Sequence, residues 1–502
     1  MSRRTRVPEL PIPLHEHGVP LHRAAYDALR GAILEGRLRP GARLPSTRDF
    51  AEQLGVARGT VVAAFDQLAA EGYIVGRRGS GTFVTRDLPD AWLQVKPRGT
   101  KRRARPRAPH LSRWGAGLDG STNPFASGSG ALRPFRTHLP ALDAFPHEAW
   151  SRMVARAARR SVGTRLADID IRGVRALREA IAEHLRVARG VSCSAEQVIV
   201  LPSVQQALDI TARLVLDPGD RAWMEDPGYA GVRPLLEGLG AEIVPLPIDG
   251  GGLDVAAGIE RAPDARFAYV TPAHQAPLGV TLSIERRLAL LDWATTHGAW
   301  IFEDDYDSEF RYEGRPLAAL QGLDGAGVVI HAGSFSKTMS PAMRLAYVIV
   351  PDALLDRFVT AKSVLDRFTP PLAQVALAEF MGEGHFVSHL RRMRELYAER
   401  RSALLEAIAS ELGGAVEVIG SNAGLDLCVW LPPGVDDRAA AQALAAHAVV
   451  ATPLSAVAIR PLQRGGLLLG FAAFKPVRLR AAVVAMGAAL APLLRDRERG
   501  CS

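Results

Sequence analysis

The residues with the clearest capacity for chemistry surround Lys337. The string from Gly333 to Arg344 follows an apolar, strand-like run and is rich in serine. A lysine amine held away from water can attack a carbonyl carbon, whereas hydroxyl and guanidinium groups bind phosphate. Ser334, Ser336 and Arg344 can therefore converge on a phosphate beside the amine. Lys337 is our candidate for a covalent link to a ligand.

An acidic cluster, Glu303 to Glu309, closes another apolar run before Lys337 in the sequence. A carboxylate at the carboxyl end of a parallel strand points into the crevice where α/β proteins bind ligands. Taken alone, the cluster would fit a helix cap or a solvated acidic loop better. Together with the lysine string it meets the needs of pyridoxal phosphate: a Schiff-base lysine, a carboxylate for the ring nitrogen, a group for the ring oxygen and donors for the phosphate.

A third group of candidates lies near the N-terminus, in a pattern typical of nucleic-acid binding. A recognition helix contacts base edges with its first residues, and the helix before it rests on phosphate. Donors are therefore needed at the start of both helices and at the tip of a following hairpin. The candidate DNA-binding residues are Arg43, Ser46, Arg48, Arg58, Gly59, Thr60, Arg78, Gly79 and Ser80.

These donors are expected on a small helical domain that ends in a hairpin. Apolar residues at helical spacing predict helices over 21–35, 47–54 and about 58–71. Ser46 is a suitable N-cap for the second helix. Two short apolar runs flank a Gly/Arg turn within 73–84, which indicates a hairpin. We therefore predict a winged helix-turn-helix over residues 20–86.

The rest of the chain divides into a linker and a larger domain. Residues 87–130 are predicted to be a flexible basic linker, with seven basic residues in twelve from Lys96 to Arg107. A solvated tether and a second DNA contact fit this stretch about equally. Residues 131–495 are predicted to form an α/β domain with a largely parallel sheet and a smaller C-terminal lobe after about residue 365. The strand-like runs are 197–201, 241–246, 267–270, 300–303, 328–330 and 345–350.

Charge and composition agree with this division. Residues 1–110 hold 20 Lys and Arg against 10 Asp and Glu, whereas the remainder holds 41 against 43. A basic first fifth ahead of a near-neutral body favours a nucleic-acid module, although a basic tail that aids solubility is the alternative. The three cysteines share no close spacing, so neither a disulfide framework nor a metal site is predicted. With no signal core and no run of roughly 18 apolar residues, we expect a cytoplasmic protein without a membrane span.

Two sets of strings resemble a known family. Leu44 to Val61 and the hairpin from Tyr73 resemble the GntR family of regulators. Trp223 to Tyr229, Thr271 to Val280 and the two strings around Asp304 and Lys337 resemble, in order, the MocR/PdxR subfamily. The resemblance covers about residues 20–490. It implies a multi-domain DNA-binding transcription regulator, with a winged helix-turn-helix (α+β) joined to an α/β fold-type I PLP-dependent aminotransferase-like domain.

The resemblance also implies roles for individual residues. Lys337 would carry pyridoxal 5'-phosphate (PLP) as a Schiff base, Asp304 would pair with the ring nitrogen, and Tyr306 would reach the ring oxygen. Asp305 is the alternative to Asp304 because the two are adjacent. Tyr229 would stack on the ring, and Ser334, Ser336 and Arg344 would hold the phosphate. The other cofactor-binding candidates are Ser203, Val204, His274 and Gln275.

The resemblance further implies a homodimer that binds double-stranded operator DNA and senses PLP or a small amino compound. Three departures bear on cofactor binding: Ser203-Val204 replaces a usual Gly-containing pair, Asp168 to Gly173 lacks a usual tyrosine, and His138 replaces a common glycine. Two alternatives stay open, an aminotransferase with an appended DNA-binding domain and a regulator that has lost cofactor use. Leu467 to Ala472 lacks the carboxylate-binding arginine of aminotransferases, which favours a sensor or a non-carboxylate effector, although Arg460 and Arg464 are near. Residual transamination half-reactions remain compatible with the sequence.

Overall fold

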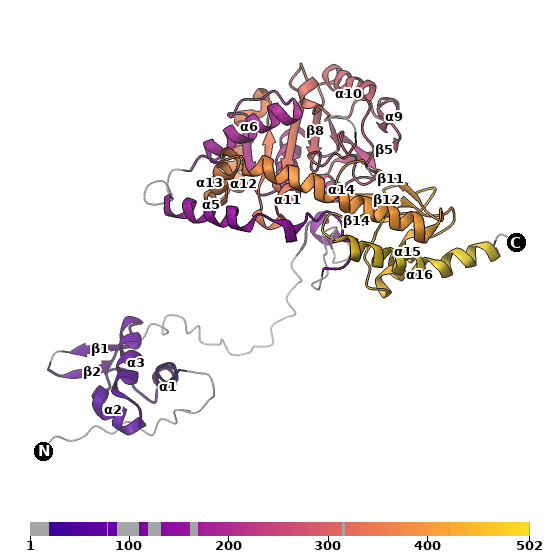
Figure 1. The fold of residues 1–502 in the computed structure, drawn as a ribbon. Coiled ribbons are helices and arrows are strands. Elements are labelled where there is room, and N and C mark those ends of the chain that lie inside the picture. Colours follow the sequence, from indigo (N-terminus) through magenta and orange to yellow (C-terminus); the bar gives the residue numbers. More distant parts are fainter. Residues whose placement is uncertain are drawn as a thin grey trace. The chain divides into compact units, whose positions relative to one another are not determined.

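The chain forms two compact units, Met1–His110 and Leu111–Ser502, in the computed structural model drawn in Figure 1. The structure describes residues 20–77, 79–87, 110–118, 132–160, 169–313, 317–420 and 422–500. Arg78 and Asp168 lie outside the described residues. The two units are described separately below.

The N-terminal unit is the predicted winged helix-turn-helix. It contains α1 (Leu21–Leu34), α2 (Thr47–Leu54), α3 (Arg58–Ala70), β1 (Ile74–Arg77) and β2 (Gly81–Val84). Ser46 caps α2 by accepting a hydrogen bond from the Asp49 N–H at 3.2 Å, and α2 ends at Gly55 with φ of +62°. The two strands pair antiparallel from Ile74↔Val84 to Arg77↔Gly81. Apolar side chains from all three helices and the hairpin fill one core.

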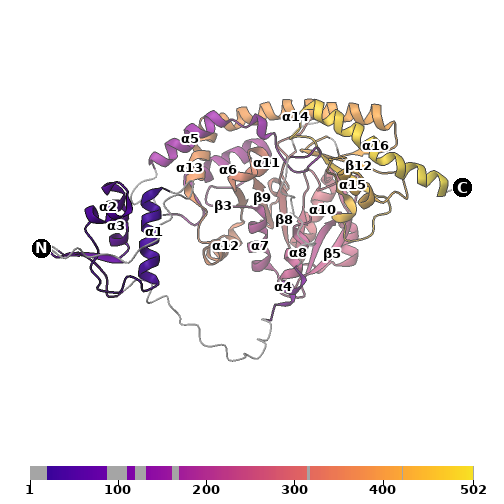
Figure 2. The ribbon, with the colours of Figure 1, turned by 90° about the horizontal axis from the view of Figure 1, so that it is seen from below.

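An eight-stranded sheet forms the centre of the larger unit, in the order β3-β10-β9-β8-β7-β4-β5-β6. The strands β4, β5, β7, β8 and β9 run parallel, whereas β10 is antiparallel to both of its neighbours. Strands such as β3 and β7 are buried along their whole length, because helices cover both faces (Figures 1 and 2). The sheet strands are β3 (Val198–Leu201), β4 (Arg221–Asp226), β5 (Glu242–Asp249), β6 (Gly252–Leu253), β7 (Phe267–Val270), β8 (Trp300–Asp305), β9 (Val329–Ser334) and β10 (Ala346–Ile349).

Helices surround this sheet and lead into the C-terminal lobe. They are α5 (His147–Arg160), α6 (Arg175–Arg189), α7 (Val204–Val215), α8 (Val232–Gly238), α9 (Val255–Arg261), α10 (Ile284–His297), α11 (Phe335–Thr338), α12 (Asp352–Leu365), α13 (Pro371–Gly382) and α14 (His385–Leu412). The lobe adds β11 (Glu417–Ile419), β12 (Asp426–Trp430), α15 (Asp437–Ala446), β13 (Thr452–Pro453), β14 (Gly466–Gly470) and α16 (Pro476–Gly500). Its four strands form an antiparallel sheet in the order β11-β12-β14-β13.

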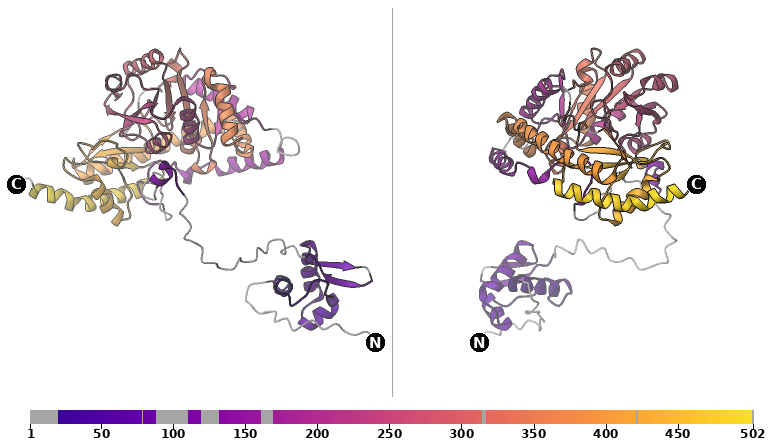
Figure 3. Two further views of the ribbon diagram at one scale, coloured as in Figure 1. Left: turned by 180° about the vertical axis from the view of Figure 1, so that it is seen from behind. Right: turned by 45° about the vertical axis from the view of Figure 1, so that its right-hand side comes forward.

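The last helix, α16, lies along α14 (Figures 2 and 3). The sequence was expected to contain no membrane span, but the span Pro476–Arg495 is long and apolar enough to cross a membrane by length and composition. Leu479, Val483, Met486 and Leu490, however, are buried in the main hydrophobic core. One face of α16 therefore packs within the protein, whereas Val477 and Val484 on the same helix are exposed.

The structure describes only a part of the predicted linker, 87–130. Residues 88–109 and 119–130 lie outside the described residues, but the piece between them contains a short helix, α4 (Arg113–Gly117). The Trp114 indole Nε1 donates a hydrogen bond to the Pro234 carbonyl in α8 at 3.3 Å. Trp114 also packs against Gly238, where a Cβ would overlap the indole. An aromatic anchor within a polar segment thus attaches this piece to the larger unit.

Candidate functional site

The register of the sheet brings the predicted cofactor residues to one edge. Ala346 of β10 lies opposite both Leu201 of β3 and Ser334 of β9, while Asp304 of β8 lies opposite Ala332 of β9. Residues that follow β3, β8 and β9, or precede β10, therefore meet at the same end of these strands. That end is where ligands bind in open α/β sheets.

Asp304 and Asp305 point to opposite faces of the sheet, because side chains alternate along a strand. The Tyr269 hydroxyl donates to Asp304 Oδ2 at 2.7 Å, whereas Asp304 Oδ1 is buried without a hydrogen-bond partner. Burial raises the pKa of Asp304 to about 6, and the Tyr269 hydrogen bond only partly offsets this. Asp305 instead forms a buried ion pair with Arg189, Nε to Oδ2 at 2.8 Å. Each carboxylate of the doublet has one buried oxygen without a hydrogen-bond partner, but only Asp305 has its charge balanced by an arginine. Asp304 is thus the member of the doublet whose charge is left for a ligand.

Lys337 occupies the short helix α11 directly after β9. Its Nζ donates a hydrogen bond to the His138 carbonyl at 2.9 Å. Burial lowers the pKa of Lys337, although the carboxylates of Asp426, Asp307 and Asp304 act in the opposite direction. A less basic amine has a larger neutral, nucleophilic fraction near neutral pH.

His274 and Tyr306 lie together on the same side of the site. His274 Nδ1 is 3.0 Å from Asp307 Oδ1 and 3.2 Å from the Tyr306 hydroxyl. Burial opposes a charge on His274, but the Asp307 carboxylate outweighs it and raises the pKa of the imidazole. Because Asp307 occupies the Nδ1 hydrogen, the Tyr306 hydroxyl can keep its own hydrogen for another acceptor.

Tyr229 and Gln275, two further predicted site residues, differ in what their side chains contact. The ring of Tyr229 stacks on that of Tyr269, with centroids 6.4 Å apart and planes inclined by 24°, so it lies over the Asp304 side of the sheet. The Gln275 amide is used within the protein. Its Nε2 donates to the Pro227 carbonyl at 2.9 Å and its Oε1 accepts from the Leu278 N–H at 2.9 Å. Gln275 therefore supports the loop and its amide has little left for a ligand.

Groups able to bind an anion follow β3 and β9 or precede β10, at the same end of the sheet as Lys337. Ser203 is the N-cap of α7 and accepts from the Gln206 N–H, and Ser334 is the N-cap of α11 and accepts from the Ser336 N–H. Each hydroxyl keeps its hydrogen to donate. Val204 begins α7, whose first N–H groups have no partner within the helix. Arg344 is exposed and makes no hydrogen bond or ion pair with any residue that the structure describes. These groups are suited to a phosphate.

Sequence reasoning missed Tyr269 and Asp426. Tyr269 is the one hydroxyl in the buried strand β7, and Asp426 is a carboxylate at the start of an otherwise apolar strand, β12. A polar group in a fully buried strand was the available signal, since such a group needs a partner.

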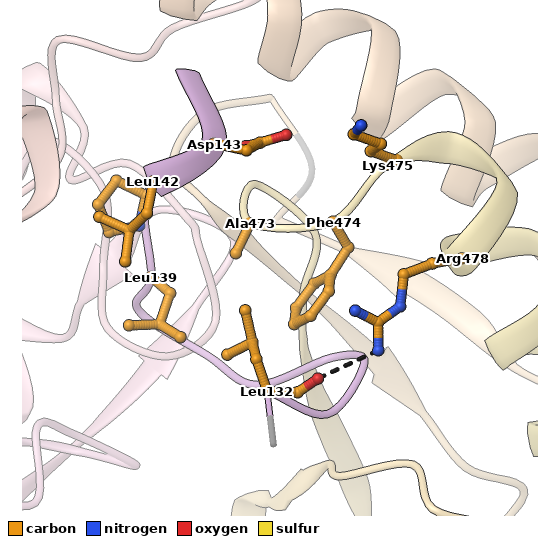
Figure 4. A pocket seen from close by; sticks show the side chains of 9 residues that line it. Leu132, Leu139, Leu142, Asp143, Ala473, Phe474, Lys475 and Arg478 are labelled. Carbon is orange, nitrogen blue, oxygen red and sulfur yellow. Dashed lines mark hydrogen bonds between the residues drawn. The ribbon is translucent and has the colours of Figure 1, made fainter. Parts of the chain in front are cut away.

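The described residues also line a pocket outside this site, shown in Figure 4. Its lining residues are Leu132, Leu139, Pro140, Leu142, Asp143, Ala473, Phe474, Lys475 and Arg478. Arg478 closes one side by donating to the Leu132 carbonyl at 3.1 Å. None of these side chains belongs to the set around Lys337.

The predicted DNA-binding residues of the N-terminal unit are mostly exposed. Arg43, Arg48 and Arg58 are exposed and form no ion pair or hydrogen bond with the described residues. Arg58, Gly59 and Thr60 open α3, and Gly79 and Ser80 form the turn of the hairpin. Unpaired arginines at the start of the second helix of such a motif are suited to phosphates and base edges.

The comparisons with known proteins cover both units. Residues 21–84 match the model of bacterial regulatory proteins of the gntR family, and residues 144–485 match that of aminotransferase class I and II. The chain is 40% identical over 475 residues to the probable rhizopine catabolism regulatory protein MocR of Rhizobium meliloti, covering 95% of this chain and 94% of that one. It is 32% identical to the pyridoxine biosynthesis transcriptional regulator PdxR of Corynebacterium glutamicum, covering 80% and 82%.

Solved structures support the fold of the larger unit. A multiple substrate aminotransferase of Thermococcus profundus superimposes with a TM-score of 0.69 at 25% identity, over 77% of this chain and 98% of that one. An α-aminoadipate aminotransferase of Thermus thermophilus, complexed with N-(5'-phosphopyridoxyl)-L-leucine, gives 0.67 at 26% identity, over 77% and 100%. The helix-turn-helix unit, the fold-type I unit and these relatives together show that the chain belongs to the MocR/PdxR subfamily of GntR transcription regulators.

Proposed function

We propose that this regulator holds PLP at Lys337 and changes its action on operator DNA when PLP or a small amino compound binds. The observation that carries the cofactor assignment is Asp304 Oδ1, a buried carboxylate oxygen without a partner beside Lys337. An unsatisfied buried acceptor is costly, and a protonated ring nitrogen would satisfy it. The fold family generally uses this cofactor, which agrees with the assignment.

The residues present fit each part of PLP. Lys337 Nζ would hold its aldehyde carbon, Asp304 its ring nitrogen, Tyr306 its ring oxygen, and Tyr229 would cover its ring. The phosphate would be held by Ser203, Ser334, Ser336, Arg344 and the N–H of Val204. Bound PLP supplies a carbon that is electrophilic toward amines.

The protein's own groups prepare the site for an amine. Burial lowers the pKa of Lys337, so its amine gives up a proton more readily than an exposed lysine does. Tyr269 holds Asp304 by one oxygen and directs the other toward the site. His274, bound to Asp307, sets the orientation of the Tyr306 hydroxyl.

The N-terminal unit would place α3 in the major groove, with Arg58 on a base edge, Arg48 on phosphate and the hairpin beside the backbone. A homodimer would present two such units to two half-sites. We expect the protein to act in the cytoplasm. The relatives' names refer to rhizopine catabolism and pyridoxine biosynthesis in their own organisms, and for this chain we propose only a small amine or PLP itself.

Borohydride reduction after incubation with PLP tests the cofactor assignment. The wild-type protein should gain one phosphopyridoxyl group, which peptide mapping should locate on Lys337. Lys337→Ala should lose both the visible absorbance and the label while keeping its fold by circular dichroism. Lys475→Ala is the matched control, because Lys475 is exposed and away from the sheet edge. A label that persists on another residue of the Lys337→Ala protein would refute the assignment.

A further inference from the structure

The Lys337 amine is joined to the C-terminal lobe by a short chain of hydrogen bonds. Lys337 Nζ donates to the His138 carbonyl at 2.9 Å. The His138 N–H donates to the two oxygens of Asp426 at 3.0 and 3.2 Å, and His138 Nδ1 lies 2.8 Å from Asp426 Oδ2. Asp426 is buried at the start of β12. One carboxylate therefore lies a single residue away from the amine that a ligand would meet.

The conformation of His138 makes this arrangement possible. Its φ of +62° is in the left-handed region, which side chains other than glycine rarely adopt. In this conformation the His138 carbonyl accepts a hydrogen bond from Lys337, while the His138 N–H and imidazole both contact the Asp426 carboxylate. The N–H is therefore not available to a ligand. A ligand carboxylate next to the reacting amine would have to displace Asp426 to gain a donor here.

The strand that pairs with β12 offers no replacement donor. Cys428 of β12 lies opposite Leu468 of β14, and both belong to an apolar cluster with Leu278 and Leu454. The arginines nearby in the sequence are placed elsewhere. Arg464 is bound to Glu417 at 2.6 Å and to the Leu431 carbonyl, and Arg460 is exposed.

The charges that act on Lys337 have one sign. Asp304, Asp307 and Asp426 each favour the charged form of its amine, and two of these carboxylates are paired with imidazoles, Asp307 with His274 and Asp426 with His138. Arg344, which acts on Tyr229, lies on the side that we assign to the phosphate. A second anion from a ligand would enter a region that already holds three carboxylates.

We propose that the effector is a small amine whose carbon next to the amine bears no carboxylate, and that Asp426, positioned by His138, excludes α-amino acids. This inference rests on the proposed function, since it concerns ligands of the PLP-loaded site. A hydroxyl or amide group on that carbon could donate to Asp426, whereas a carboxylate would meet a like charge. Two carboxylates in near contact should lower affinity by at least about tenfold at the effective dielectric constant found near a protein surface.

Three matched ligands test this: L-alanine, L-alaninamide and L-alaninol, which share the amine and methyl group and differ only in the carboxylate, amide or hydroxymethyl group. Each is titrated by calorimetry into the full-length PLP-loaded protein. We expect L-alanine to bind at least about tenfold more weakly than the two neutral ligands. Asp426→Asn should remove most of that difference. Arg460→Gln, the control for a hidden carboxylate-binding arginine, should leave the ranking unchanged.

The possible outcomes separate the two proposals. Equal or tighter binding of L-alanine to the loaded wild-type protein, or loss of L-alanine binding in Arg460→Gln, would overturn the inference, as would failure of all three ligands to bind. A protein that takes up no PLP would overturn the proposed function itself. The comparison of the three ligands on the wild-type protein needs no variant. If Asp426→Asn does not fold, His138→Gly takes its place. This variant leaves the Asp426 charge intact, so it should still bind L-alanine more weakly than the two neutral ligands.

Discussion

Replacing Asp304 with Asn should abolish PLP binding and at the same time stabilise the cofactor-free protein. Burial raises the pKa of Asp304 from its ordinary 3.8 to about 6. One pH unit corresponds to about 1.4 kcal/mol, so keeping this carboxylate charged inside the fold costs about 3 kcal/mol at pH 8. Asn has no charge to desolvate and can still accept the Tyr269 hydrogen bond. The charged Asp304 carboxylate therefore lowers the stability of the cofactor-free protein, while it provides the acceptor that we propose for the ring nitrogen of PLP.

The pH dependence of this effect has a definite sign. Because the folded pKa is raised, the folded protein binds the proton more tightly than the unfolded chain does. The cost of the charge is absent below about pH 4, grows between about pH 4 and 6, and is constant above that. The advantage of Asp304→Asn should thus be about 3 kcal/mol at pH 8 and roughly half of that at pH 5.

Urea unfolding of the cofactor-free protein measures this difference. The fluorescence of Trp223 and Trp293 reports on the larger unit, because these two buried rings stack with centroids 3.7 Å apart. Asp209→Asn is the control, since Asp209 pairs with Arg213 on the surface and its loss should change stability by no more than about 0.5 kcal/mol. The reasoning is wrong if Asp304→Asn is no more stable than the wild type at pH 8, or if its advantage does not change with pH.

Three other predictions concern DNA, signal transfer and packing. Arg58→Ala should cost roughly 1–3 kcal/mol of operator affinity and relax sequence specificity. Arg48→Ala should weaken binding to all DNA sequences alike and flatten its salt dependence. Unchanged operator affinity of Arg58→Ala would contradict our assignment of α3 as the recognition helix. Binding of PLP or the effector should change the affinity for operator DNA, and operator DNA should change the affinity for that ligand by the same factor. Identical ligand titration curves with and without DNA would refute this coupling. Gly424→Ala should destabilise the larger unit by at least about 2 kcal/mol in thermal or urea unfolding. The reason is that Gly424 has φ of +79° and that a Cβ there would overlap His274 and Asp307. An unchanged free energy of unfolding would contradict this packing.

Local signals in the sequence were sufficient for much of the fold. The helices predicted at 47–54 and from Arg58 appear as α2 and α3, because a capping serine, a terminal glycine and periodic apolar residues act within a few residues. The six strand-like runs all appear in the large sheet. The edge strand β6 and the strand β4 were not predicted as strands, although β4 lies within a string that the family resemblance had singled out.

The sequence by itself determined the kinds of chemistry available, namely a lysine among hydroxyls, a carboxylate cluster and a basic helical unit. Only the tertiary structure separates the two carboxylates of the doublet, because their surroundings depend on the register of β8 between its neighbours and on Arg189, which pairs with Asp305 from a distant helix. The same holds for Asp426 and His138, which are far apart in the chain and meet Lys337 only through the packing of the C-terminal lobe. Motifs are local in sequence, whereas the partners that set the charge and orientation of their side chains are brought in by long-range packing.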